Sequence, residues 1–197
     1  EITMNTKVWN MYKGSDEGQK LLDLFNPEPE DIGFYLEKVF EYAHDVNKEL
    51  PLEVSFGHFD HIFWNIHLLD ANQYHISKDD ITREDFEAFI TELELMCLQL
   101  NEEEDALELS DDIYIRKDDY RAKASLMYAA SLALYYYHSF LKPMLYPNRF
   151  DVLERKCTAI GIDLPPIPRS NNYAEYLMYY YDICVAINQF QTDNGMT

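Results

Sequence analysis

Apolar residues recur every three or four positions along most of the chain, which is the spacing of an amphipathic helix. The clearest case is the segment 82–100, where Thr82 and Asp85 resemble a capping box at the start of a helix. The apolar residues predicted to face the core are Phe86, Phe89, Ile90, Leu93, Cys97 and Leu100. The acids that fall mostly on the other faces are Glu84, Asp85, Glu87, Glu92 and Glu94. This segment is therefore predicted to cover one side of a core.

Further helices are predicted on either side of this segment, over 15–25, 27–48, 58–70, 118–141 and 148–161. Ser15 is a suitable N-cap for the first of them. Gly161 followed by Ile162 predicts that the last one ends in a Schellman turn. Residues 49–57 form a connection, in which a short strand around Val54 and Phe56 stays an open alternative.

Two of the predicted helices, about 120–141 and 172–190, are apolar almost all round, and helices of this kind are usually central in a bundle. The sequence therefore predicts an all-α fold, a compact bundle of about six or seven helices with these two at its centre. We expect a single globular domain over residues 1–197, with 1–14 and 191–197 as the segments where fraying is expected.

The charge of the chain is concentrated in one segment. The chain carries a net charge of −20, and residues 79–119, with sixteen acids and three bases, account for −13 of it. Residues 1–78 carry −8 and residues 120–197 carry +1. Charge acts on partners and solubility more than on fold. A protein this acidic is repelled by DNA, RNA and anionic membranes, so its charge favours a basic protein as the partner.

The acids of segment 82–100, about half of this acidic band, can be explained without a partner, because an amphipathic helix places its acids on the solvent-facing side. The connector that follows, NEEEDALELSDD at residues 101–112, is different. Its neighbouring acids repel one another, which costs stability unless a cation or a basic partner relieves the repulsion. The residues predicted to bind a partner are Glu102, Glu103, Glu104, Asp105, Glu108, Asp111, Asp112 and Tyr114.

The chain has sixteen tyrosines, with one run at 135–137 and another made of Tyr173, Tyr176 and Tyr179–Tyr181. Successive residues of a helix lie about 100° apart, so we expect at least one tyrosine of each run near the surface. Tyrosine is enriched at protein interfaces because a rigid aromatic ring ends in a hydrogen-bonding hydroxyl. Two interpretations stay open, namely exposed anchors for a partner and core-edge residues whose hydroxyl groups point into water.

The three cysteines, Cys97, Cys157 and Cys184, lie far apart among apolar neighbours, which predicts reduced core thiols in a cytoplasmic protein. The sequence EITMNTKVW lacks the basic and apolar regions of a signal peptide. The longest uncharged run, Ala124–Leu141, has 18 residues, but it holds four tyrosines, three serines and His138. We therefore predict a buried core helix there and no membrane association.

Candidate chemistry is sparse. His58, His61 and Asn65 lie on one predicted helical stripe, whereas a metal site needs three or four converging ligands, so His75 or an acid would have to join them. Glu41-x-x-His44 has the spacing that di-iron bundles use twice, but it occurs once here. No nucleophile elbow, phosphate-binding loop or dinucleotide motif is present. We therefore assign no catalytic residue, no metal site and no cofactor from the sequence.

The leading hypothesis is an acidic protein-interaction module, an inhibitor or immunity-type protein that binds a basic partner such as a toxin or nuclease. One alternative is a metal-dependent helical enzyme that uses His58 and His61. A second alternative is a nucleic-acid mimic whose carboxylates imitate a path of phosphates. A third is a structural module with a symmetric apolar surface. No direct binding to nucleic acid is expected, and the sequence leaves the oligomeric state open.

Overall fold

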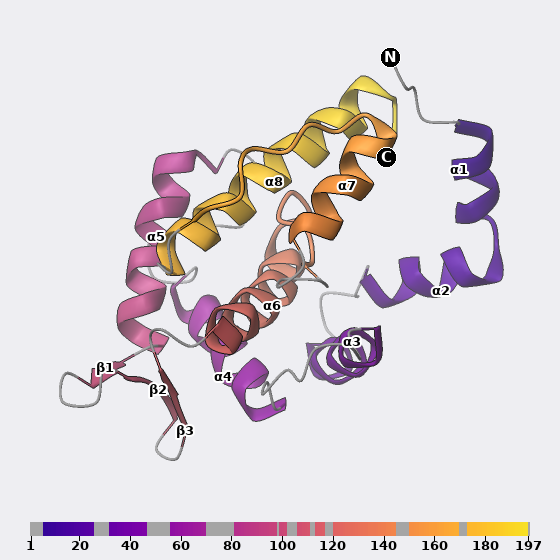
Figure 1. Cartoon of the computed structure of the whole chain (residues 1–197). Helices are drawn as coiled ribbons and strands as arrows, with labels where there is room; N and C mark the ends of the chain where they lie inside the picture. Colours follow the sequence, from indigo (N-terminus) through magenta and orange to yellow (C-terminus); the bar gives the residue numbers. More distant parts are fainter. Residues whose placement is uncertain are drawn as a thin grey trace.

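The computed structural model describes residues 6–25, 32–46, 56–69, 81–97, 99–101, 106–110, 113–116, 120–144, 150–169 and 173–196. The helices in this part of the chain are α1 Thr6–Lys13, α2 Asp16–Phe25, α3 Ile32–Val46, α4 Phe56–Leu69, α5 Arg83–Cys97, α6 Tyr120–Tyr137, α7 Phe150–Ile160 and α8 Tyr173–Asp193 (Figure 1). The strands are β1 Gln99–Asn101, β2 Ala106–Ser110 and β3 Ile113–Arg116. The predicted helical bundle is confirmed, and a small sheet is added to it.

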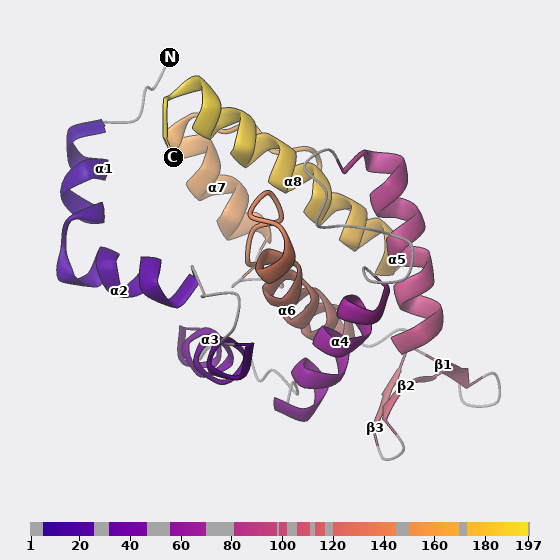
Figure 2. The same ribbon diagram turned by 180° about the vertical axis from the view of Figure 1, so that it is seen from behind.

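The two helices predicted to be central, α6 and α8, are central. Every residue from Met127 to Leu134 of α6 is buried. In α8, burial extends over Leu177–Tyr181 and continues at Ile183 and Cys184. Helix α4 packs on α6, and α5 packs on both α4 and α8. Helices α5 and α7 lie on opposite sides of α8, as the two opposite views show (Figures 1 and 2).

Helix α5 has the predicted amphipathic arrangement. Its residues Phe86, Phe89, Ile90 and Leu93 are all buried in the core. The backbone N–H of Asp85 donates a hydrogen bond of 3.1 Å to Oγ1 of Thr82, so Thr82 caps the helix as predicted. The side chains predicted to continue this buried face, Cys97 and Leu100, lie outside the described side chains.

Two further helix-end predictions are confirmed. The Oγ of Ser15 accepts a hydrogen bond of 3.1 Å from the backbone N–H of Gly18, which caps α2. At the end of α7, Gly161 has a φ of 96°, and the N–H of Ile162 donates to the carbonyl of Cys157 at 2.8 Å. This is the Schellman turn, and it needs glycine because other residues rarely adopt a positive φ. Asn148 and Asn172, where two further helices are predicted to begin, lie outside the described residues.

Three features differ from the sequence predictions. Helix α1 forms at residues where no helix was predicted. Helix α8 continues to Asp193 and ends in a second Schellman turn, in which the N–H of Met196 donates to the carbonyl of Gln191 at 2.8 Å. A small sheet, which the sequence did not predict, forms between α5 and α6, and its middle strand β2 belongs to the acidic connector. Of the connection at 49–57, residues 49–55 are not described and Phe56 already belongs to α4.

Candidate partner-binding surface

The described residues between α5 and α6 form an antiparallel sheet of three short strands in the order β1-β2-β3, and β2 belongs to the acidic connector. Strand β1 packs near the end of α5 and β2 packs near α4, and the sheet lies at the edge of the molecule in both views (Figures 1 and 2). Its register places Leu100, Leu107 and Ile115 in one row across the strands. Alternate rows belong to opposite faces of a sheet, so this apolar row is separated from the polar rows beside it.

Two of the predicted binding residues lie directly opposite each other in this sheet. Glu108 of β2 pairs with Tyr114 of β3, in the same row as Gln99 of β1. The register shifts between Glu108 and Ser110, which leaves Leu109 as the extra residue of a β-bulge. The other predicted residues, Glu102, Glu103, Glu104, Asp105, Asp111 and Asp112, lie outside the described residues. In the sequence they occupy the two connections that join the three strands.

The outer face of α5 extends the acidic surface. Glu84, Asp85 and Glu87 are exposed, and Glu92 is half-buried. None of the exposed three forms an ion pair with another described residue. Because α5 leads directly into β1, these acids and those of the connector follow one another along a single continuous segment.

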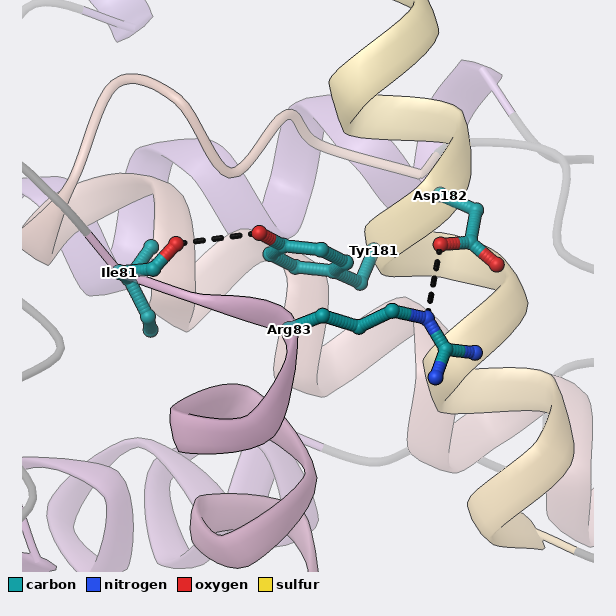
Figure 3. Close-up of polar contacts among 4 residues, drawn as sticks. All are labelled: Ile81, Arg83, Tyr181 and Asp182. Carbon is teal, nitrogen blue, oxygen red and sulfur yellow. Dashed lines mark hydrogen bonds and ion pairs between the residues drawn. The ribbon is translucent and has the colours of Figure 1, made fainter.

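Arg83, one of the three bases in the acidic band, is held by a residue outside it. Its Nε donates a hydrogen bond of 3.3 Å to Oδ1 of Asp182 on α8 (Figure 3). This hydrogen bond to Asp182 raises the pKa of Arg83, and the charges of Glu87 and Glu84 add to the effect. Asp182 is also the only charged residue between Tyr176 and Ile187. The ion pair therefore joins the start of α5 to α8.

The tyrosine runs do not form the exposed surface that we considered. Tyr176 is half-buried, whereas Tyr179, Tyr180 and Tyr181 are only 3%, 1% and 6% exposed, so the three consecutive tyrosines are all buried. The reason is that neighbours surround α8 on three sides. The hydroxyl of Tyr181 donates to the carbonyl of Ile81 at 3.0 Å (Figure 3), and the ring of Tyr179 packs on Phe150 of α7.

The other run, 135–137 of α6, is half-buried. Tyr136 and Tyr137 pack against Phe63 of α4 with ring centroids 5.4 and 5.6 Å away. Both runs therefore belong to aromatic clusters of the bundle. The aromatic residues that are exposed in the described part of the chain are Tyr12, Phe34 and Trp64, which belong to α1, α3 and α4.

The described cysteines are core residues, as predicted. Cys157 and Cys184 are free and buried. Burial raises the pKa of the Cys184 thiol to about 11, although the backbone N–H of Lys142 donates to its sulfur at 3.3 Å. Burial also raises the pKa of Cys157. A thiol with a raised pKa stays protonated at neutral pH, which makes it a poor nucleophile and a poor metal ligand.

The histidine motifs gain no further ligands from the described residues. His58 and His61 lie in α4, but their side chains are outside the described set, and His75 is not described. In the part of the chain that the structure describes, no three histidine, cysteine or acidic side chains are grouped closely enough to hold a metal ion. Glu41 forms an ion pair with Lys38 at 3.7 Å, and the side chain of His44 is not described.

A surface that the sequence predictions missed lies on α1. The helix exposes Val8, Met11 and Tyr12, which are spaced three and four residues apart. That spacing is an amphipathic signal, and it could have been found by the same search that found α5.

Comparison of the chain with protein-family models, with curated proteins and with solved structures finds no significant match. None of the described helices combines the length and the apolar character needed to cross a bilayer. The function is therefore argued from the charge and geometry of the surface itself.

Proposed function

We propose that the protein is an acidic interaction module that binds and blocks a basic protein partner through the connector between α5 and α6. The observation that carries the proposal is the location of the charge. Residues 79–119 carry −13 of the net −20, and the described part of this range consists of α5 and the sheet, which lies at the edge of the molecule (Figure 1). The proposed contact residues are the seven acids of the connector together with Tyr114 of β3, namely Glu102, Glu103, Glu104, Asp105, Glu108, Asp111, Asp112 and Tyr114.

The proposed mechanism is electrostatic steering followed by docking. A concentrated negative field attracts a basic surface over about one Debye length, which is about 8 Å at physiological salt. Such fields raise association rates by one to three orders of magnitude and reject acidic partners. The exposed acids Glu84, Asp85 and Glu87 would widen the field toward the start of α5. The buried tyrosines of α8 have no part in this mechanism.

A protein partner is favoured over imitation of a nucleic acid. A mimic needs carboxylates spaced along an extended ridge. The longest strand of the sheet, β2, has five residues, and it contains one acid, Glu108. Five residues of strand span about 17 Å. In the sequence, the remaining connector acids form two short groups, 102–105 and 111–112, one on each side of β2, instead of the evenly spaced row that a mimic needs.

Affinity capture from the source-cell lysate, with nuclease added, tests the proposal. The full-length chain should retain a basic protein at low salt and release it at high salt, because salt screens charge pairs. A variant with Glu102, Glu103, Glu104 and Asp105 changed to lysine should not retain it. Failure to retain any basic protein at low salt would contradict the proposal.

The matched control changes the same amount of charge elsewhere. Asp23, Asp45, Asp163 and Asp193 are exposed and lie outside the acidic band. Changing these four to lysine alters the net charge by the same amount as the connector variant. Three of them lie in the last turns of helices, where a positive charge is favourable to the helix dipole. If the control variant retains the basic partner, binding depends on the connector. If both variants lose the partner equally, the change in overall charge explains the loss.

A further inference from the structure

Helix α1 is an exposed basic arm. None of its eight residues is buried, and Val8, Met11 and Tyr12 are 59%, 67% and 39% exposed. Its charged residues are Lys7 and Lys13, so it is a basic helix in a strongly acidic protein. It packs against α2 and lies at the opposite end of the molecule from the sheet in both views (Figures 1 and 2).

The arm is held in a fixed direction. The rings of Trp9 and Tyr12 stack with centroids 6.2 Å apart, and Nζ of Lys13 lies 5.7 Å from the centroid of the Trp9 ring. At the corner with α2, a Cβ on Gly18 would come within 2.0 Å of the carbonyl oxygen of Tyr12. The glycine therefore permits a backbone contact that fixes α1 against α2. A fixed arm loses little conformational freedom when it binds.

A groove of about 410 Å³ on α3 is complementary to the α1 arm in charge and in apolar character. It is lined by Gly33, Leu36, Glu37, Phe40 and Glu41. Leu36 is buried and Phe40 is half-buried, which gives the groove an apolar floor, while both glutamates are exposed. No atom of the described residues lies within 4 Å of a Cβ built on Gly33, so this end of the groove is open to an incoming side chain.

We propose that the α1 arm of one copy docks into the α3 groove of a second copy, and that the exchange is reciprocal and forms a symmetric dimer. The lengths agree, since the eight residues of α1 and the stretch from Gly33 to Glu41 each span about 12 Å of helix. The charges agree as well, because the arm has two lysines and the groove has two exposed glutamates, of which Glu41 is shared with Lys38 of its own helix. The exposed face of Val8, Met11 and Tyr12 would cover Leu36 and Phe40.

The distribution of charge favours a second copy over an anionic membrane. Basic amphipathic helices bind anionic lipid surfaces, but a membrane would repel the net charge of −20. Helices α1, α2 and α3 together carry four lysines and six acids, so the proposed interface is almost neutral. The two acidic bands would lie at the far ends of the dimer, where salt screens their repulsion. This inference goes beyond the proposed binding of a basic partner and stands without it.

Sedimentation velocity of the full-length chain over a range of concentrations tests the dimer. We expect a monomer–dimer equilibrium in the wild-type protein. Met11→Glu should weaken it roughly a hundredfold, because the change costs about tenfold at each of two equivalent contacts. Val185 of α8 is similarly exposed, at 43%, so Val185→Glu is the matched control and should leave the dimer intact. A monomer at all concentrations, or a dimer unchanged by Met11→Glu, would overturn the inference.

Filling the groove supplies an independent variant. Gly33→Leu should fold, because the site is open and leucine is the better helix former, and it should prevent dimer formation. A mixture of Met11→Glu with Gly33→Leu should form a heterodimer, since one arm and one groove remain intact. Absence of association in this mixture, or binding of a monomeric wild-type chain to phosphatidylserine vesicles, would contradict the reciprocal exchange.

Discussion

The hydroxyl of Tyr180, in the middle of α8, donates a hydrogen bond of 2.7 Å to the backbone carbonyl of Lys142. This bond fastens the chain that leaves α6 to the central helix, where Asn188 makes a second bond of 2.8 Å to the carbonyl of Phe140. The hydroxyl of the adjacent Tyr179 is buried too, but it has no hydrogen-bond partner in the described part of the chain. Two neighbouring buried tyrosines therefore differ in what their hydroxyl groups contribute.

Removing these two hydroxyl groups should have unequal effects on stability. Tyr180→Phe leaves the carbonyl of Lys142 without its donor and should lower the free energy of unfolding by about 1–3 kcal/mol. Tyr179→Phe removes a hydroxyl without a described partner and should change it by less than about 0.5 kcal/mol. Urea denaturation of both variants measures the difference. Equal losses would show that the Tyr180–Lys142 bond does not stabilise the fold.

Alkaline pH should destabilise the protein. Burial raises the pKa of Cys184 from 9.0 to about 11, and burial together with the charges of Glu154 and Cys157 raises the pKa of Tyr179 from 10.0 to about 12. The folded state holds these protons more tightly than the unfolded state. Their contribution is therefore complete below pH 9 and is lost as pH rises from about 9 to 11 for Cys184 and from about 10 to 12 for Tyr179.

Denaturation curves recorded between pH 7 and pH 11 measure this loss, which should approach roughly 1 kcal/mol per pH unit for each group. Replacing both Cys184 and Cys157 with alanine removes the thiol titrations that begin near pH 9 and should move the onset up by about one pH unit. A free energy of unfolding that stays constant to pH 11 would mean that the Cys184 thiol is not buried as described.

Substitution of glycine by alanine should have opposite effects on stability at positions 18 and 33. Gly18→Ala places a methyl group against the carbonyl oxygen of Tyr12 and should loosen the α1–α2 corner, at a cost of about 1–3 kcal/mol. Gly33→Ala meets no described atom and should stabilise α3 by up to about 1 kcal/mol. Hydrogen exchange of the amides of α1 and α3 measures both effects. Unchanged exchange in α1 of the Gly18 variant would contradict the close contact at the corner.

Elemental analysis of the purified protein separates the proposed module from the metal-dependent enzyme. We expect no transition metal in a stoichiometric amount. A bound metal that is lost in the His58→Ala/His61→Ala variant would favour the enzyme, because these histidines of α4 are the ones with a shared helical stripe.

The parts of the fold that local physics determines could be predicted from the sequence. The buried face of α5, the caps at Ser15 and Thr82 and the turn at Gly161 each depend on residues close together in the chain. The central position of α6 and α8 followed from their nearly continuous apolar surface.

The other features depend on contacts between distant residues. The burial of Tyr181 depends on Ile81 and Phe86, which are about a hundred positions away in the sequence. Strands β1, β2 and β3 form by pairing with one another, so the sequence of each strand alone gives little indication of a sheet. For the candidate binding site, the structure adds one relationship that the sequence did not predict, the pairing of Glu108 with Tyr114.

The rate of association with the captured basic partner tests the central claim most directly. Stopped-flow measurements would compare the wild-type chain, the connector variant (Glu102, Glu103, Glu104 and Asp105 to lysine) and the charge-matched control (Asp23, Asp45, Asp163 and Asp193 to lysine). We predict that the connector variant associates at least about tenfold more slowly than the control, and that added salt removes the difference. Equal association rates for the two variants would contradict a binding role for the connector.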